Sequence, residues 1–346
     1  MTWLWEKRDS NALQFAYWAD SSWWDVKTLK TGRNWFVNWA DFPGIFAHSN
    51  GSLITYTLEK NNPDTYAYDI SLSVSWDQGN SWLNGTVPHK DQTETEHGFV
   101  SFFEYDENKT GMIWLDGRNY ILEDPNLKNM TVRFATIDRL GHIANEQELD
   151  AKVCSCCQTD AARTKSGAVV VYRDRSDEEI RDISYLLLED GQWSEPKALS
   201  NDQWEIAACP VNGPAVDAAE EKIAAVWYTA PMGNAQVKWA FSIDGGHSFS
   251  EAILVDDQNP KGRVDLKIVG GEIWISWIAT QNNDGLVKLN RYDWNADLIE
   301  SHIIGAIDVN RDSGFPRMAY AANNLLIAWT NQKPKEESLI LYRLTF

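Results

Sequence analysis

The sequence lacks an apolar run of the roughly 20 residues that a membrane-spanning helix requires, so no membrane span is expected. Its first ten residues, MTWLWEKRDS, are charged and rich in Trp, unlike a secretory signal peptide. Segments rich in Pro, Gly and Ser that would mark a linker are also missing. Because all-β domains often exceed about 200 residues, we expect a single domain over residues 1–346.

Basic residues are scarce as well. Lys and Arg number 31 against 50 Asp and Glu, which gives a net charge of -19 at pH 7. A surface of this sign repels the phosphates of nucleic acids and of anionic membranes, so nucleic-acid binding is not expected. An anionic small molecule stays compatible with this charge, because salt screens charges beyond about 10 Å and a local group of Arg residues reverses the potential in one pocket.

Helical periodicity is a third absence, and short strand-like runs take its place. Eighteen Trp, 12 Tyr and 12 Phe suit half-buried pleated surfaces. Strand-like runs bounded by Gly, Asn, Asp and Pro turns occupy residues 53–58, 68–75, 168–172, 222–229, 237–242, 272–278 and 325–330. Many short strands with regular turns indicate an all-β sandwich, barrel or propeller.

An internal repeat selects the propeller. A segment with Pro or Gly, a variable turn and an apolar strand recur with anchors 52 to 58 residues apart, at Pro43, Gly98, Cys156, Pro210, Val264 and Pro316. This period corresponds to one four-stranded blade, and each unit reads as the inner two strands of a blade. Residues 1–30 resemble strands two to four of a blade, and the C-terminus resembles strands one to three. We therefore favour seven blades over six, with the first and last incomplete, and expect the natural chain to begin upstream of Met1.

Two segments match the pattern S-x-D-x-G-x-x-[WF], at residues 75–82 and 242–249. The pattern is typical of a hairpin turn in which Asp accepts backbone N–H groups and Gly supplies a positive φ. With the inner-strand motifs WADFP, EHGF, WLDGR, CxCCQT, CPVNGP and GFPR, these segments resemble sialidases and related Asp-box (BNR repeat) propellers, in particular an uncharacterised bacterial group often labelled exo-α-sialidase. The resemblance covers nearly the whole chain, and it implies that Asp77 and Asp244 are structural.

The start of each blade's first strand faces the mouth of the channel in such a fold. Reactive residue types stand at these starts in six successive repeats. They are Asp41, Glu96, His97, Cys154, Cys156, Cys157, Cys209, Arg263, Asp265 and Arg317. Two interpretations stay open: a ligand site at the mouth, or a solvated channel with internal salt bridges.

The family resemblance implies a particular chemistry for a ligand site. Sialidases use a Tyr nucleophile activated by Glu, and three Arg hold the substrate carboxylate because a guanidinium binds it bidentately. On this reading Asp41 is the acid/base and Glu96 the partner of a Tyr. The Arg candidates are Arg118, Arg173, Arg175, Arg181, Arg263 and Arg317. The chain departs from the family, since the Arg-Ile-Pro signature is absent, Phe315-Pro316-Arg317 reverses it, and no Tyr is assignable.

The four cysteines form a second group, at the starts of two neighbouring inner strands. Three interpretations of this group stay open. One of Cys154, Cys156 or Cys157 forms a disulfide with Cys209, the thiols bind copper or zinc together with His97, or the thiols are inert. The C-x-C-C spacing matches no standard zinc motif.

Three functions follow as alternatives. They are a propeller that binds an anionic glycan or small carboxylate at the channel mouth, a sialidase-type glycoside hydrolase, and a copper or zinc protein. A propeller fold hosts all three. The Cys pattern and the resemblance favour an exported protein, periplasmic or extracellular, over a cytoplasmic one.

Overall fold

The computed structural model describes residues 1–19, 22–23, 26–282, 284–333 and 336–346. The described chain is built of β-strands joined by turns and four one-turn 3-10 helices. It divides into two compact units, Met1–Ser155 and Cys156–Phe346, and each is described by itself below. No helix among these residues is long and apolar enough to cross a membrane.

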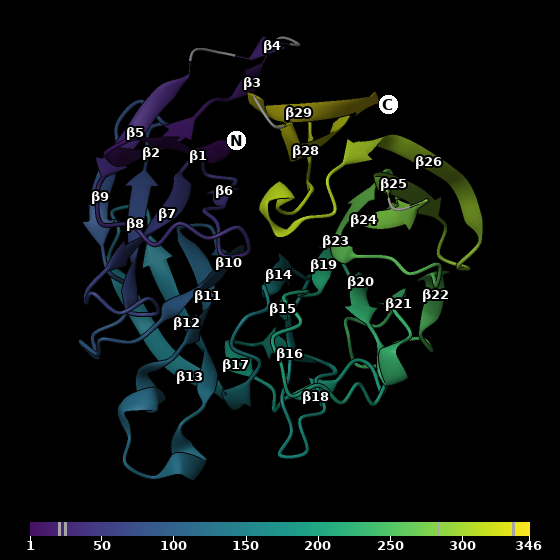
Figure 1. Cartoon of the computed structure of the whole chain (residues 1–346), viewed down its shortest axis with the longest axis horizontal. Helices are drawn as coiled ribbons and strands as arrows, with labels where there is room; N and C mark the ends of the chain where they lie inside the picture. The colour runs from purple at the N-terminus through teal and green to yellow at the C-terminus, as the bar shows by residue number, and fades with distance from the viewer. Residues whose placement is uncertain (20–21, 24–25, 283, 334–335) are drawn as a thin grey trace. The chain divides into compact units, whose positions relative to one another are not determined.

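The first unit contains three antiparallel sheets and a short ribbon (Figure 1). The first sheet has three strands, β1 (Thr2–Lys7), β2 (Ser10–Phe15) and β5 (Lys27–Gly32), and β3 (Trp18–Ala19) pairs with β4 (Ser22–Trp23). The second sheet holds β6 (Ile45–Ala47), β7 (Leu53–Lys60), β8 (Tyr68–Ser75) and β9 (Leu83–Thr86). The third holds β10 (His97–Asp106), β11 (Lys109–Asp116), β12 (Met130–Asp138) and β13 (Ile143–Val153), with η1 (Arg118–Ile121) and η2 (Pro125–Leu127) between β11 and β12.

The second unit contains four sheets, again in chain order. The first comprises β14 (Asp160–Arg163), β15 (Gly167–Arg173), β16 (Ile183–Glu189), β17 (Gln192–Trp193) and β18 (Lys197–Ala198). The second comprises β19 (Ala215–Ala219), β20 (Lys222–Thr229), β21 (Gln236–Ser242) and β22 (Ile253–Asp256), with η3 (Pro231–Gly233) after β20. The third comprises β23 (Gly262–Val269), β24 (Glu272–Gln281), β25 (Asp284–Tyr292) and β26 (Leu298–Ile307). The last comprises β27 (Arg317–Ala321), β28 (Asn324–Lys333) and β29 (Glu336–Thr345), preceded by η4 (Arg311–Ser313).

Each sheet is an antiparallel meander whose burial falls from the middle strands to the outer strand. The strand β11 is buried along nearly its whole length, whereas β13, at the edge of the same sheet, is mostly exposed. Strands that are buried on both faces read as continuous apolar runs, which explains sequences such as GAVVVYR in β15. In the first unit, residues of neighbouring sheets share one core, including Tyr56, Leu72, Trp114 and Ala135.

The seven sheets are the blades of an all-β, seven-bladed β-propeller, so the predicted fold class is confirmed. The first and last sheets have three strands among the described residues, as the sequence predicts. The predicted single domain over residues 1–346 stays a prediction.

The two S-x-D-x-G segments form turns with the same hydrogen bonds. Asp77 accepts from the backbone N–H of Ser81 at 2.8 Å and from its hydroxyl at 2.6 Å, and Asp244 accepts from the same groups of Ser248 at 3.0 and 2.6 Å. These bonds lower the pKa of Asp77 to about 2. Both turns join the third and fourth strands of their sheets, so their carboxylates serve the turns.

Candidate functional site

Asp41 in the first unit is buried between two blades. It precedes β6, its side chain is 2% exposed, and its Oδ1 accepts the backbone N–H of Phe99 at 2.9 Å. The Tyr68 hydroxyl faces the carboxyl group, but Oδ2 accepts no hydrogen bond of good geometry from the described residues. Burial raises the pKa of Asp41 to about 7, against the smaller opposing effects of Phe99 and Tyr68. Asp41 is therefore poised between the acid and the carboxylate near neutral pH.

Tyr68 is a residue that the sequence reasoning did not assign. Burial raises the pKa of its hydroxyl well above 10, and the negative charges of Asp41 and Glu96 add to the effect. The Tyr68 ring stacks on Phe36 with 4.2 Å between the ring centroids, and the side chain is 1% exposed. Asp41, Glu96 and Tyr68 thus form one group, although Tyr68 begins the third strand of one blade and Glu96 precedes the next blade.

Asn212 in the second unit occupies the same structural position as Asp41. Its Oδ1 accepts the backbone N–H of Arg263 at 2.7 Å, as Asp41 accepts Phe99, and both acceptors lie about one blade before their donors. Phe99 and Arg263 have the same left-handed backbone, with φ of 53° and 50°. A glycine precedes each donor, and a Cβ there would lie 2.0 Å from Asp41 Oδ2 or 2.4 Å from Asn212 Oδ1. The arrangement is therefore a repeated clamp between blades.

His97 is fully buried beside this group and is held by acceptors on both ring nitrogens. Its Nδ1 lies 3.2 and 3.1 Å from the carbonyl oxygens of Tyr68 and Thr95. Its Nε2 lies 3.2 Å from Asp91 Oδ2 and 3.6 Å from Asp116 Oδ1. Burial alone would lower the pKa of His97, but these carboxylates outweigh it and raise the pKa above 6.5. A protonated imidazolium would donate from both nitrogens, and the same ring belongs to two groups that could hold a metal ion, one with Asp69 and His89 and one with Asp91 and Asp116.

His89 stacks on His97, with centroids 3.8 Å apart and ring planes 4° from parallel. Its Nδ1 lies 2.9 Å from Asp91 Oδ1. Arg118 extends the network, because its Nε and one terminal nitrogen donate to the two oxygens of Asp116 at 2.8 and 2.7 Å and the same terminal nitrogen reaches Glu146 at 2.8 Å. The predicted ligand residue Arg118 is thus part of a charged network that also holds His97.

Arg173 and Arg263 in the second unit donate mainly to backbone carbonyls. The buried guanidinium of Arg173 donates to the carbonyl oxygens of Asn212, Tyr228 and Arg181 at 2.5–3.1 Å. The guanidinium of Arg263 donates to Ser313 Oγ at 2.8 Å and to the carbonyls of Gly314 and Asn310 at 2.8 and 3.0 Å. These hydrogen bonds give both arginines a structural role, in which they connect loops. Their role in ligand binding stays a prediction.

Arg175 and Arg181 lie together on the loop between β15 and β16. Arg175 donates to both Glu179 oxygens through two nitrogens at 2.5–3.1 Å, and Arg181 donates to Glu179 Oε2 at 2.7 Å. These hydrogen bonds lower the pKa of Glu179 to about 2, so it stays ionised. Two guanidinium groups therefore share one carboxylate, on a loop that also carries Asp174, Asp177, Glu178 and Asp182. The Arg175 side chain is 29% exposed.

Arg317 begins β27, with its Nε 3.4 Å from Asp265 Oδ2 and a side chain that is 43% exposed. Asp265 is one of three inner-strand aspartates with a common pattern. Each accepts the backbone N–H of its own next residue, and each also accepts an N–H of the following blade's inner strand. The pairs between blades are Asp160 with Val216 (2.9 Å), Asp217 with Ile268 (2.9 Å) and Asp265 with Met318 (2.7 Å).

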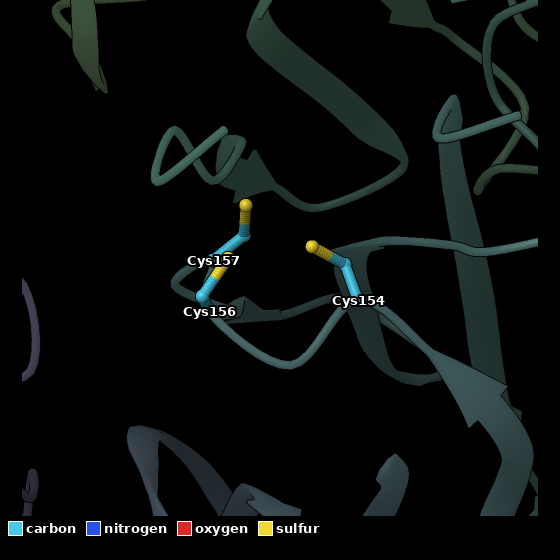
Figure 2. Close-up of side chains that lie close together, drawn as sticks. All are labelled: Cys154, Cys156 and Cys157. Carbon is cyan, nitrogen blue, oxygen red and sulfur yellow. The ribbon is translucent and has the colours of Figure 1, made fainter. Parts of the chain in front are cut away.

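Cys154, Cys156 and Cys157 bring their sulfur atoms within 4.8 Å of one another. Figure 2 shows the thiol of Cys154 directed toward Cys157. Neither His97 nor Cys209 belongs to this group among the described residues, and Cys209 is exposed. The predicted roles of the four cysteines, disulfide or metal, stay predictions.

No family model matches the chain, and no curated protein matches it in sequence. Solved structures do match. The chain is similar to the NanB sialidase from Streptococcus pneumoniae, with 10% identity and a TM-score of 0.54, over 86% of this chain and 66% of that one. The chain thus spans about two thirds of the length of that sialidase.

Two other similar structures are carbohydrate enzymes by name. One is the GH93 α-L-arabinofuranosidase of Fusarium graminearum in complex with arabinobiose, with 12% identity, a TM-score of 0.53 and coverage of 88% and 92%. The other is a PL25 ulvan lyase bound to a GlcA(1-4)Rha3S oligosaccharide, with 12% identity, a TM-score of 0.52 and coverage of 90% and 83%. These similarities show that the fold is a sialidase-like β-propeller, as the sequence motifs predicted.

Proposed function

We propose that the protein binds an acidic carbohydrate or another small carboxylate through the loop that carries Arg175 and Arg181. The pair of guanidinium groups around Glu179 supports this most directly, because it places two guanidinium groups on one loop and the Arg175 side chain is partly exposed. A guanidinium binds a carboxylate through two parallel N–H donors. Guanidinium groups gathered in one place attract an anion in spite of the overall sign of the chain.

The similar structures support a carbohydrate as the ligand. The sialidase, the arabinofuranosidase and the ulvan lyase are carbohydrate enzymes by name, and the ulvan lyase is bound to an oligosaccharide that contains glucuronic acid. Because a fold does not determine function, the carbohydrate class rests on analogy and the acidic character on the Arg pair.

Calorimetric titration with N-acetylneuraminic acid, a glucuronate-containing oligosaccharide and a neutral oligosaccharide tests this proposal. We expect binding of an acidic ligand only, with an affinity that falls at least about tenfold in R175A, the loss of one charge-assisted pair. The matched control is R139A, which removes an equal charge from the exposed turn between β12 and β13. Equal affinities of R175A and the wild type, or no binding of either acidic sugar, would reject the proposal.

A second candidate function is glycoside hydrolysis, which Asp41 favours. A carboxyl group with a pKa of about 7 suits a general acid, and Tyr68 lies with Asp41 and Glu96, as a Tyr nucleophile and its Glu partner would require. Binding without hydrolysis ranks first, since Tyr68 is almost fully buried and Asn212 performs the structural task of Asp41 elsewhere.

A fluorogenic sialoside assay separates the two functions. Hydrolysis predicts turnover by the wild type and a loss of at least about 100-fold in D41N and in Y68F, the range of general acid-base catalysis. Turnover that persists in both folded variants, or no turnover by the wild type at any pH from 5 to 8, would leave binding alone.

A further inference from the structure

We infer that Cys154, Cys156 and Cys157 form a three-thiolate site for a soft metal ion, with copper(I) as the preferred ion. This inference is independent of the carbohydrate proposal. The three sulfur atoms lie within 4.8 Å of one another. Three sulfurs bound to one ion at about 2.3 Å form a triangle with sides of roughly 4 Å, so the thiols need to move by about 1 Å at most to bind it.

The cysteines lie on one short connecting segment. The strand β13 ends at Val153 and β14 begins at Asp160. The sulfur group lies within residues 154–157 of this segment. Its spacing is therefore a property of consecutive residues, and the turn at Ser155–Cys156 folds the Cys154 side chain toward the other two (Figure 2).

Burial and donor type decide which ion fits. Cys154 and Cys157 are buried, and Cys156 is half-buried. Thiolates are soft ligands that select copper(I) and zinc over hard cations. The sulfur group consists of three cysteines, whereas structural zinc sites have four protein ligands. Copper(I) binds stably in a trigonal set of three thiolates, so the donor count favours it.

His97 lies outside this site, although the sequence grouped it with the cysteines. Both of its ring nitrogens face oxygen acceptors. The site is therefore all sulfur, and ion binding releases thiol protons, so affinity rises with pH.

Anaerobic competition titration of the reduced full-length protein tests the site, with copper(I) as its acetonitrile complex against a bathocuproine chelator and zinc against a chromophoric chelator. We expect one copper per chain, with a near-ultraviolet thiolate-to-copper charge-transfer band. The affinity falls at least about 100-fold when a ligand is removed, in C154S, C156S and C157S. The control C209S removes the remaining cysteine and is expected to bind within about threefold of the wild type.

Several outcomes would overturn the inference. They are loss of copper to the chelator at one equivalent, an equal loss in C209S, or zinc binding that is tighter than copper binding. Finding fewer than four thiols in the denatured protein without reductant would show a disulfide instead. Since Cys154 and Cys157 are buried, their Ser variants can fail to fold. C156S keeps the test decisive, and its melting temperature verifies that it is folded.

Discussion

Asp41 and Asn212 show how one side chain serves both structure and chemistry. Each accepts a backbone N–H from a left-handed residue of the next blade, with a glycine packed against its side chain. Asn accepts this bond as a neutral amide, so the clamp does not require a negative charge. Asp41 stands in the corresponding position, and burial raises its pKa to about 7. Ionisation of Asp41 therefore lowers the stability of the folded state.

Substitution of Asp41 by Asn isolates that cost. Because the folded pKa of about 7 lies above the usual value of 3.8, the stability contributed by the protonated group is complete below about pH 4 and is lost as the pH rises to 7. We expect the stability of D41N relative to the wild type to rise from pH 5 to about pH 7 and then to level off. The rise is about 1.4 kcal/mol for each pH unit up to the folded pKa, a few kcal/mol at most.

Urea unfolding of both proteins at pH 5 and pH 8 measures this difference. A difference in unfolding free energy that does not change with pH would show that Asp41 is ionised throughout. Lower stability of D41N at both pH values would show that the clamp needs a carboxylate.

Gly98 makes the close approach of Asp41 feasible. A Cβ at this position would lie 2.0 Å from Asp41 Oδ2, and buried overpacking typically costs about 1–3 kcal/mol. We expect G98A to lower the melting temperature and the free energy of unfolding by that amount. The control is G44A, where an added Cβ meets nothing within 4 Å. Equal stability of the two variants would show that the Asp41 side chain moves away without cost.

At the scale of strands, the inner-strand aspartates join consecutive blades. Inner strands of neighbouring blades do not pair in one sheet, so their facing N–H groups need acceptors from side chains. Asp160, Asp217 and Asp265 each supply one oxygen to their own strand and the other to the next. Asp265 is among the residues that the sequence predicts at a ligand site or in a solvated channel, and its hydrogen bonds give it a structural role there.

Substitution of Asp265 by Ala tests the joining role. It leaves the N–H of the buried Met318 without its acceptor, which costs about 1–3 kcal/mol. We expect amide hydrogen exchange of Met318 to accelerate by at least about tenfold in D265A. The control is the backbone N–H of Ile268, which donates to Asp217. We expect its exchange rate to be unchanged in D265A. Unchanged protection of Met318 would show that the strands are held by other contacts.

At the scale of the whole molecule, the sequence predicts the blades better than the site. The repeat spacing and the two S-x-D-x-G segments can be recognised in the sequence. The hydrogen bonds of these two turns span only four residues. Tyr68 has no such signal, because it meets Asp41 and Glu96 only through blade packing. Arg173 and Arg263 were predicted from residue type, but their partners are mainly backbone carbonyls, which a sequence pattern does not reveal. Side-chain chemistry therefore locates candidates, and only packing reveals their partners.

The net charge of -19 is the other property of the whole chain with a measurable consequence. Excess like charge destabilises a compact state through self-repulsion, and salt shortens the range of this repulsion to about 10 Å at 0.1 M. We expect the melting temperature at pH 7 to rise by a few degrees as NaCl increases from about 10 to 300 mM. The rise is smaller at pH 5, where some carboxylates bind protons. Salt also screens favourable pairs such as Arg118 with Asp116 and Glu146, so a melting temperature that falls with salt at pH 7 would show that attraction within these networks exceeds the repulsion among the surplus acids.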